Sequence, residues 1–323
     1  MDLGIHLPQV ARAGSVPSGQ RVRQVAALAA RLDFAAVCAN DHLAFRRPWL
    51  DGLTALAAVS SITGSLQLAT TVALPAVRGP VQLAATVAAL DALAPGRVVA
   101  AVGAGSSATD HALAGLPFDR RWTTFEEAVA VLRALLSGQP LPEGWAERLG
   151  DQVPASAVAT GPVPIWVAAW GSPAGLRRVA RLGDGWLASA YHTTPAELGA
   201  ARVRLDRELT GLGRDPGAVP SALATMWTWV TDDDRRAEEV LRTEVAPLVG
   251  LPVSALRGRL CVGTARTCAE LLAQYQDAGC ARVHLWPLGD EVTQLHRITE
   301  EVVPLLDLSS PSANPARPRP PGG

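Results

Sequence analysis

Short apolar runs alternate with longer amphipathic segments along most of the chain. The runs are rich in β-branched residues and have the length of buried strands. The segments between them repeat their apolar residues at helical spacing, as in residues 267–278. The pattern predicts eight strands separated by helices, with the strands at 3–7, 34–39, 66–74, 98–105, 164–169, 185–190, 222–230 and 282–288.

Strands that alternate with helices form parallel sheets with right-handed crossovers, and near-continuous apolar strands suit burial on both faces. A doubly wound open sheet is the competing arrangement. Eight regular repeats, and the lack of a Gly-x-Gly-x-x-Gly motif after the first strand, favour a closed (β/α)8 TIM barrel of the α/β class. We expect one barrel over residues 1–308 and a disordered proline-rich tail over 309–323.

The alternation is interrupted once, between the fourth and fifth predicted strands. Residues 138–161 contain several prolines and glycines and predict a short inserted loop with little regular structure. One interpretation is that this insertion trims the lid over the active site, in which case it would not pack closed over the barrel mouth.

Composition narrows the possible chemistry. All 29 basic residues are arginine, so Schiff-base aldolase chemistry and a phosphate-loop lysine are excluded. The net charge of −1 indicates no nucleic-acid partner, and no apolar run is long enough to span a membrane. Four cysteines without a Cys-x-x-Cys pair, and an N-terminus without a signal-peptide pattern, predict a cytoplasmic protein with reduced thiols.

The active site of such a barrel lies at the carboxyl ends of its strands. Asp41 and His42 follow the second predicted strand. They could carry out acid–base catalysis or hydrogen-bond to a cofactor. The alternative interpretation is that Asp41 only caps the loop and His42 is solvated. The 103–105 glycine turn after the fourth strand lets a ligand approach the backbone, or is simply a tight turn. The 171–173 segment after the fifth strand offers an anion the N-terminus of a helix, or is only a good cap.

Other chemistries find less support in the sequence. The six histidines are scattered and the first strand lacks a His-x-His motif, so we expect no metal. A Gly-x-Ser-x-Gly hydrolase motif is also absent. Trp170 and Trp286 fall where a planar ring could meet them.

Several linked segments resemble the luciferase-like monooxygenase superfamily, whose members use FMN or the deazaflavin coenzyme F420. The segments are GIHLPQ, NDHL, LATTVALPAVRGPVQLAATVAALDALAPGRVVAAVGAG and PIWVAAWGSPAGLRRVARLGDGW, and the resemblance covers most of residues 1–306. It implies a luciferase-like barrel whose third strand bulges, often with a non-prolyl cis peptide behind the cofactor ring. The matching bond here is Thr71–Val72.

The resemblance also implies roles for single residues. Asp41 and His42 match the Asp-His pair of the deazaflavin branch, in which the Asp contacts the cofactor and the His moves a proton or binds substrate. The implied cofactor-binding residues are Asp41, Thr70, Thr71, Val72, Gly103, Ala104, Gly105, Ala168, Ala169, Trp170, Gly171 and Ser172. We expect the substrate to meet His6, Ser106, His192, His284 and Trp286.

Two positions depart from the sugar-phosphate dehydrogenases of that branch. A glutamate after the Gly-x-Gly turn is Ser106 here, and a phosphate-binding lysine after the sixth strand is His192. A sugar-phosphate substrate is therefore not expected. Any acid role falls to His42 or to Asp110.

The sequence thus predicts an F420-dependent oxidoreductase that moves hydride between the deazaflavin C5 and a small organic substrate, with His42 moving the proton. One alternative is an FMN-dependent monooxygenase that uses reduced flavin and oxygen. Another is a barrel that binds a flavin-like ligand without turnover, and a metal hydrolase is a further one. A homodimer would agree with the resemblance, because members of the family are commonly dimers.

Overall fold

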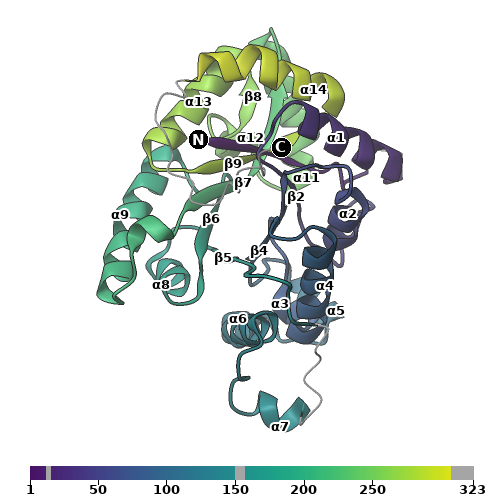
Figure 1. The fold of residues 1–323 in the computed structure, drawn as a ribbon. Coiled ribbons are helices and arrows are strands. Elements are labelled where there is room, and N and C mark those ends of the chain that lie inside the picture. Colours follow the sequence, from purple (N-terminus) through teal and green to yellow (C-terminus); the bar gives the residue numbers. More distant parts are fainter. Residues whose placement is uncertain (12–15, 150–156, 307–323) are drawn as a thin grey trace, which may run out of the picture.

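The computed structural model describes residues 1–11, 16–149 and 157–306. Its described strands form one parallel sheet, and eight of them close into a barrel in the order β1-β2-β3-β4-β5-β6-β7-β9, with β9 pairing back to β1 (Figure 1). The closed TIM barrel expected from the sequence is confirmed. The strands are β1 (Asp2–His6), β2 (Ala36–Ala39), β3 (Gln67–Thr70), β4 (Val98–Val102), β5 (Ile165–Ala168), β6 (Gly185–Ser189), β7 (Ser221–Val230), β8 (Cys261–Gly263) and β9 (Arg282–Pro287).

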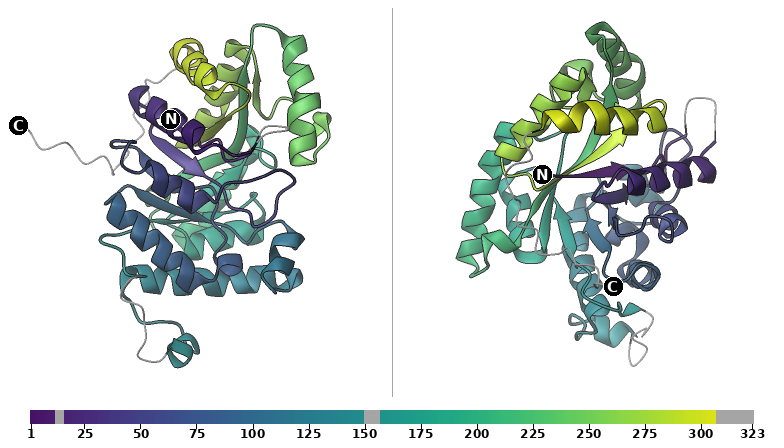
Figure 2. Two further views of the ribbon diagram at one scale, coloured as in Figure 1. Left: turned by 90° about the vertical axis from the view of Figure 1, so that its right-hand side faces the viewer. Right: turned by 45° about the horizontal axis from the view of Figure 1, so that its top comes forward.

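Helices surround this barrel on its outer side (Figures 1 and 2). The longer ones begin at capping residues that the sequence supplies, such as Ser172 before α8 and Thr194 before α9. The described α-helices are α1 (Gly19–Arg31), α2 (Gly52–Val59), α3 (Pro75–Arg78), α4 (Pro80–Leu93), α5 (Ala108–Leu113), α6 (Arg121–Ser137), α7 (Trp145–Leu149), α8 (Pro173–Leu182), α9 (Pro195–Gly211), α10 (Asp234–Val240), α11 (Ala246–Val249), α12 (Val253–Leu256), α13 (Ala265–Asp277) and α14 (Glu291–Arg297).

Strand β8 is an element that the sequence pattern did not predict. It pairs with the carboxyl half of β7 alone, through Thr228–Val230, and takes no part in closing the ring. Three residues are too few to show the alternation of a strand. None of the helices among the described residues is both long and apolar enough to cross a membrane.

The hydrophobic core lies in two layers. The larger one fills the space between the sheet and the helices. The smaller one lies inside the barrel and consists mostly of small side chains around Trp166, namely Cys38, Ala69, Val99, Ala101, Leu187, Ala222 and Ala224. Val72 and Ala168 pack on this layer, so it forms the floor of the barrel mouth.

An aromatic stack occupies the opposite side of the barrel interior. The ring of His6 lies 3.4 Å from that of Trp286 between centroids, and Trp286 stacks on Trp227 at 4.1 Å. The Nδ1–H of His6 donates to the Leu7 carbonyl over 2.9 Å. Burial lowers the pKa of His6 from its ordinary value near 6.5 to about 3, so this imidazole is neutral in the folded protein.

The described part of the 138–161 insertion does not pack over the barrel mouth, and its effect on the lid stays a prediction. The chain leaves α6 at Ser137, at the amino ends of the strands, because α6 runs antiparallel to them. The Trp145 indole then donates to Glu127 on α6 over 2.7 Å, and the Thr160 backbone N–H donates to Asp91 over 3.0 Å. Helix α7 therefore lies outside α6, away from the strands (Figure 1). Residues 309–323, expected to be a disordered tail, lie outside the described part.

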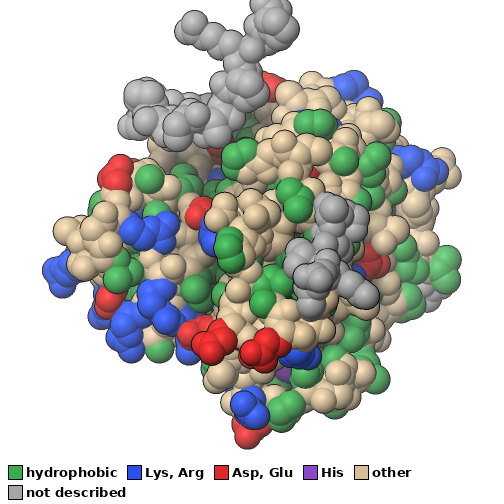
Figure 3. Space-filling model, turned by 60° about the horizontal axis from the view of Figure 1, so that its bottom comes forward, with side chains coloured by type: hydrophobic (Ala, Val, Ile, Leu, Met, Phe, Trp, Pro, Cys, Tyr) green, Lys and Arg blue, Asp and Glu red, His purple; other side chains and the backbone are tan. Residues whose placement is uncertain are grey.

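Charged side chains on the outer surface pair with one another. Arg178 and Arg181 on α8 both donate to Glu126 on α6, each over 2.6 Å. Figure 3 shows basic side chains gathered on one side of a face of the molecule, with acidic side chains bordering them. The mixture of signs on this face agrees with the near-zero net charge.

The buried His6 makes stability depend on pH. The unfolded chain binds a proton there below about pH 6.5, whereas the folded protein resists protonation down to about pH 3. The free energy of unfolding therefore falls as the pH falls through this window, by up to about 1.4 kcal/mol per pH unit for this residue. In His6→Phe, which keeps a ring against Trp286, urea denaturation between pH 7 and 4 will show a shallower fall. The exposed His296→Gln is the control and will keep the wild-type slope; a wild-type slope in His6→Phe would contradict the assignment.

Candidate active site

A cavity of about 390 Å³ opens at the carboxyl ends of the strands, within the range of small-molecule and cofactor sites. It lies between the loops that follow β2, β4, β5 and β6. The residues expected from the sequence that line it are Asp41, His42, Thr71, Val72, Gly103, Ala104, Gly105, Ser106, Ala168, Ala169, Trp170, Ser172 and His192. Sequence reasoning did not select other residues that line it, among them Asn40, Phe118, Arg121, Trp122, Ser189, Tyr191 and Thr225.

Five expected residues lie elsewhere. His6, His284 and Trp286 are buried inside the barrel and do not line the cavity. The Thr70 hydroxyl donates to the Ala101 carbonyl over 2.6 Å within the sheet. Gly171 forms the turn before α8, with a φ of 81°.

The floor of the cavity is formed by the segment after β3 and the turn after β4. The Thr71–Val72 peptide is cis, as the resemblance implied. The Asn40 side-chain oxygen accepts from the backbone N–H of Val72 over 3.0 Å. Gly103 faces this segment, and a Cβ there would lie 2.8 Å from the Val72 side chain. The glycine therefore lets the two segments approach and keeps the floor flat.

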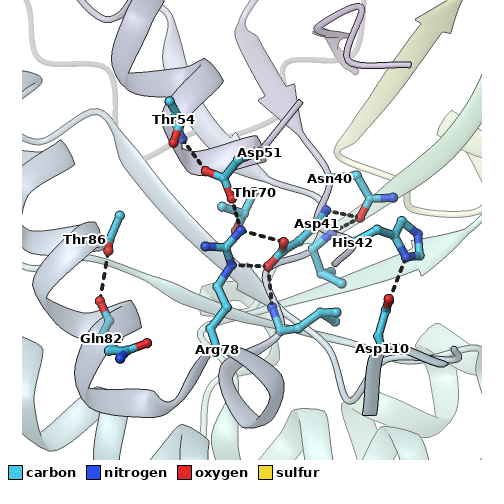
Figure 4. A network of polar contacts seen from close by, with 12 residues as sticks. Asn40, Asp41, His42, Asp51, Thr54, Thr70, Arg78, Gln82, Thr86 and Asp110 are labelled. Carbon is cyan, nitrogen blue, oxygen red and sulfur yellow. Dashed lines mark hydrogen bonds and ion pairs between the residues drawn. The ribbon is translucent and has the colours of Figure 1, made fainter. Parts of the chain in front are cut away.

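Asp41 is buried and its carboxylate is held by the segment after β3 (Figure 4). Both oxygens accept from the Arg78 guanidinium on α3, over 2.6 and 2.8 Å, and one also accepts from the Leu74 backbone N–H over 3.2 Å. Arg78 in addition pairs with Asp51, the cap of α2. These two carboxylates raise the pKa of Arg78, so the guanidinium stays charged. Asp41 thus fixes the path of the chain from β3 into α3.

His42 and Asp110 form a second polar pair at the cavity wall (Figure 4). The His42 Nδ1 lies 2.9 Å from Asp110 Oδ2, and the other Asp110 oxygen accepts from the Ala44 backbone N–H over 2.9 Å. Asp110 is only 1% exposed and lies in the first turn of α5. Trp49 meets the His42 ring edge-on at 5.0 Å. The arrangement fixes the imidazole and leaves its Nε2 to exchange a proton with a ligand.

The far end of the cavity is suited to an anion. Ser172 caps α8, and its hydroxyl accepts from the Gly175 backbone N–H over 3.2 Å. Arg121, at the start of α6, also lines the cavity and lies 4.1 Å from the centre of the Phe118 ring. No carboxylate among the described residues forms an ion pair with Arg121. A helix N-terminus and an uncompensated guanidinium together favour a phosphate.

The outer rim beside this end is aromatic. The half-exposed Trp170 stacks on His192 at 3.9 Å between ring centroids. Burial, and secondarily the positive charge of Arg259, lower the pKa of His192. His192 therefore presents a neutral ring to the cavity at neutral pH. Among the described residues, no cluster of three or more His, Cys, Asp or Glu could hold a metal ion.

Residues 1–252 match the family model described as luciferase-like monooxygenase. The chain belongs to the luciferase-like monooxygenase family. It is therefore an oxidoreductase of the luciferase-like type, and the flavin-type site expected from the sequence lies on the fold of that family. An uncharacterized protein of Mycobacterium tuberculosis strain H37Rv is 32% identical over 206 residues, which are 63% of this chain and 70% of that protein. A Mycobacterium bovis protein, likewise uncharacterized, matches to the same extent.

Solved structures of luciferase-like enzymes share the fold over nearly the whole chain. An F420-dependent secondary alcohol dehydrogenase, in complex with an F420–acetone adduct, superposes with a TM-score of 0.80 at 21% identity, covering 94% of this chain and 98% of that one. The oxygenating constituent of 3,6-diketocamphane monooxygenase from Pseudomonas putida, in complex with FMN, gives 0.70 at 16% identity, covering 95% and 98%. Neighbours with either cofactor thus have this fold.

Arg78 does not line the cavity, yet its loss should weaken the site. In Arg78→Ala the buried Asp41 carboxylate loses its partner, which we expect to destabilise the protein by about 3 kcal/mol in urea denaturation. Because Asp41 and Arg78 act as one unit, the double variant Asp41→Asn/Arg78→Ala will be much less destabilised than the sum of the single variants.

The matched control is Arg257→Ala, which removes an exposed Arg–Glu pair and should leave the melting temperature unchanged. Additive effects of Asp41→Asn and Arg78→Ala would show that the two side chains do not act together.

Proposed function

We propose that this protein is an F420-dependent oxidoreductase that transfers hydride between the deazaflavin ring and a small organic substrate. The observation that carries the proposal is the His42–Asp110 pair at the cavity wall, 2.9 Å between Nδ1 and Oδ2. Removing or adding hydride at a carbon that bears an oxygen requires a proton to move at that oxygen. A partly exposed His held by a buried carboxylate is a suitable group for that transfer.

The residues present fit a flavin-type group. Val72 and Gly103 offer a flat wall for a planar ring, since a side chain at 103 would collide with Val72. Ser172, the first turn of α8 and Arg121 are suited to the phosphate of the cofactor side chain. When bound, the deazaflavin supplies a hydride donor or acceptor at its C5.

The side chains of this protein orient the reaction and handle its proton. Asp110 holds Nδ1 of His42, so that Nε2 is the atom that gives a proton to, or takes one from, the substrate oxygen. The Ser106 hydroxyl lines the same wall and can donate a hydrogen bond to that oxygen. Phe118 and Trp122 cover the mouth with apolar surface, which limits water at the reacting atoms.

An FMN-dependent monooxygenase is the second candidate, because the Ser172–Arg121 end would suit the phosphate of FMN as well. A monooxygenase that uses reduced flavin and oxygen does not need to move a proton between the protein and an alcohol oxygen. His42 and Asp110 would therefore have a smaller role in that reaction. The two cofactors therefore make different demands on the same cavity.

Binding of each cofactor to the purified protein distinguishes these candidates. We expect oxidised and reduced F420 to bind in the micromolar range, followed by fluorescence quenching, with FMN binding far more weakly. Ser172→Ala and Arg121→Ala should each weaken binding, because they remove groups from the phosphate end. Tight binding of FMN with no binding of F420 would overturn the proposal and favour the monooxygenase.

His42→Asn and Asp110→Asn test the proton transfer. With any alcohol or carbonyl compound that the wild-type protein turns over with F420, we expect kcat to fall by about 100-fold or more in His42→Asn, in line with general acid–base catalysis. Asp110→Asn should lower kcat in the same direction while F420 affinity stays within about threefold, since its role is to orient His42.

The exposed Asp119→Asn, nine residues further along, is the matched control and should have wild-type kinetics. Wild-type kcat in both His42→Asn and Asp110→Asn would remove the pair from the mechanism.

A further inference from the structure

Thr225, on β7, adopts a backbone conformation that its side chain disfavours. Its φ is 58°, in the left-handed region that glycine occupies readily and a β-branched residue rarely does. The other non-glycine residue with positive φ among those described is Asp33, a residue type that tolerates this region in a turn. Thr225 therefore has a strained backbone that the surrounding structure must hold in place.

The strain coincides with a bulge in the barrel wall. Leu223 pairs with Val283 and Met226 pairs with Leu285, so β7 contains one residue more than β9 over this stretch. An extra residue bends a strand and turns a side chain in a new direction. Here the bulge brings the Thr225 side chain to the lining of the cavity.

The Thr225 hydroxyl belongs to a short hydrogen-bonded series. Its oxygen lies 2.7 Å from the Ala224 carbonyl, which can only accept, and 2.9 Å from the hydroxyl of Ser189 on β6. The Thr225 proton goes to the carbonyl, so the Ser189 proton goes to the Thr225 oxygen. This leaves the lone pairs of the Ser189 oxygen for a group in the cavity, which Ser189 also lines.

We propose that the Ser189–Thr225 hydroxyl pair is a ligand-binding element that accepts a hydrogen bond from a neutral N–H or O–H group in the cavity. The proposal rests on the proposed function, which supplies two sources of such a donor: the imide N–H of the flavin-type ring, and the hydroxyl of an alcohol substrate. The pair lies on the β6–β7 side of the cavity, whereas the ionisable groups come from β2 and α5. A strained backbone retained at the wall of a binding cavity is the mark of a functional constraint.

Three substitutions separate binding from stability. Ser189→Ala removes the acceptor, Thr225→Val removes the second hydroxyl but keeps the branched shape, and Thr225→Gly removes both the hydroxyl and the strain. We expect Ser189→Ala to weaken the ligand that uses the pair about tenfold, as for one buried hydrogen bond. The two Thr225 variants should weaken the same ligand to a smaller extent, because the Ser189 hydroxyl then loses the acceptor that orients it. Thr225→Gly should nevertheless melt at or above the wild-type temperature, because glycine adopts this conformation without strain.

Two separate measurements distinguish the two possible donors: the dissociation constant of the cofactor and the KM of the substrate. A rise in the dissociation constants of both F420 and FMN identifies the ring imide. Unchanged cofactor binding with a tenfold rise in KM, at saturating cofactor, identifies the substrate hydroxyl. Asp33→Gly, at the other non-glycine position with positive φ and outside the cavity lining, is the control and should change neither quantity.

The proposal is overturned if all three variants bind cofactor and turn over substrate as the wild type does. It is also overturned if Thr225→Gly loses stability while binding is unchanged, since the hydroxyl would then serve only the fold. If the wild-type protein binds neither cofactor, the proposed function fails first, and that result is distinct from either of these.

Discussion

Three consecutive side chains after β2 hold together the segments that form the cavity. Asn40 accepts from the backbone of Val72, Asp41 binds Arg78, and His42 pairs with Asp110. Each side chain reaches a different segment, so the floor after β3, helix α3 and helix α5 all depend on one short loop. Buried backbone N–H groups and buried carboxylates are stable only when they have partners, and this loop provides or receives those partners. A change in the loop would therefore disturb the whole wall at once.

The periodicity of the chain was sufficient to predict the barrel, because eight apolar strands alternating with helices leave few other closed arrangements. The loops after the strands also gave half of the residues that line the cavity. Access to the cavity was harder to predict. His6 and Trp286 lie at the carboxyl ends of β1 and β9, yet they are buried and do not line the cavity. Trp49 and Trp227 pack against Trp286, and the periodicity of the strands does not predict such contacts from other segments. Arg121 lies on α6, well beyond the end of β4 in sequence, and only the packing of that helix brings it to the site, whereas Asp110 was already a candidate acid in the sequence.

The walls of the cavity divide the chemistry among them. Ionisable groups face it from the segments after β2 and from α5, groups suited to an anion face it from α8 and α6, and the hydroxyls of Ser189 and Thr225 face it from β6 and β7. A planar ligand that extends from the α8 end therefore has one proton-exchanging side and one side that offers hydrogen bonds alone. Such an asymmetric surround favours a single orientation of the ligand, which the proposed hydride transfer at one ring carbon would require.

Helix α7 has a practical meaning because of where it lies. It packs on the outer side of α6, and none of the cavity lining comes from the described residues of 138–161. The length of the 138–161 segment can therefore differ between relatives with little effect on turnover. A tag or a reporter domain could be inserted there for the same reason. Attachment through this segment would immobilise the enzyme with the mouth of its cavity facing the solution.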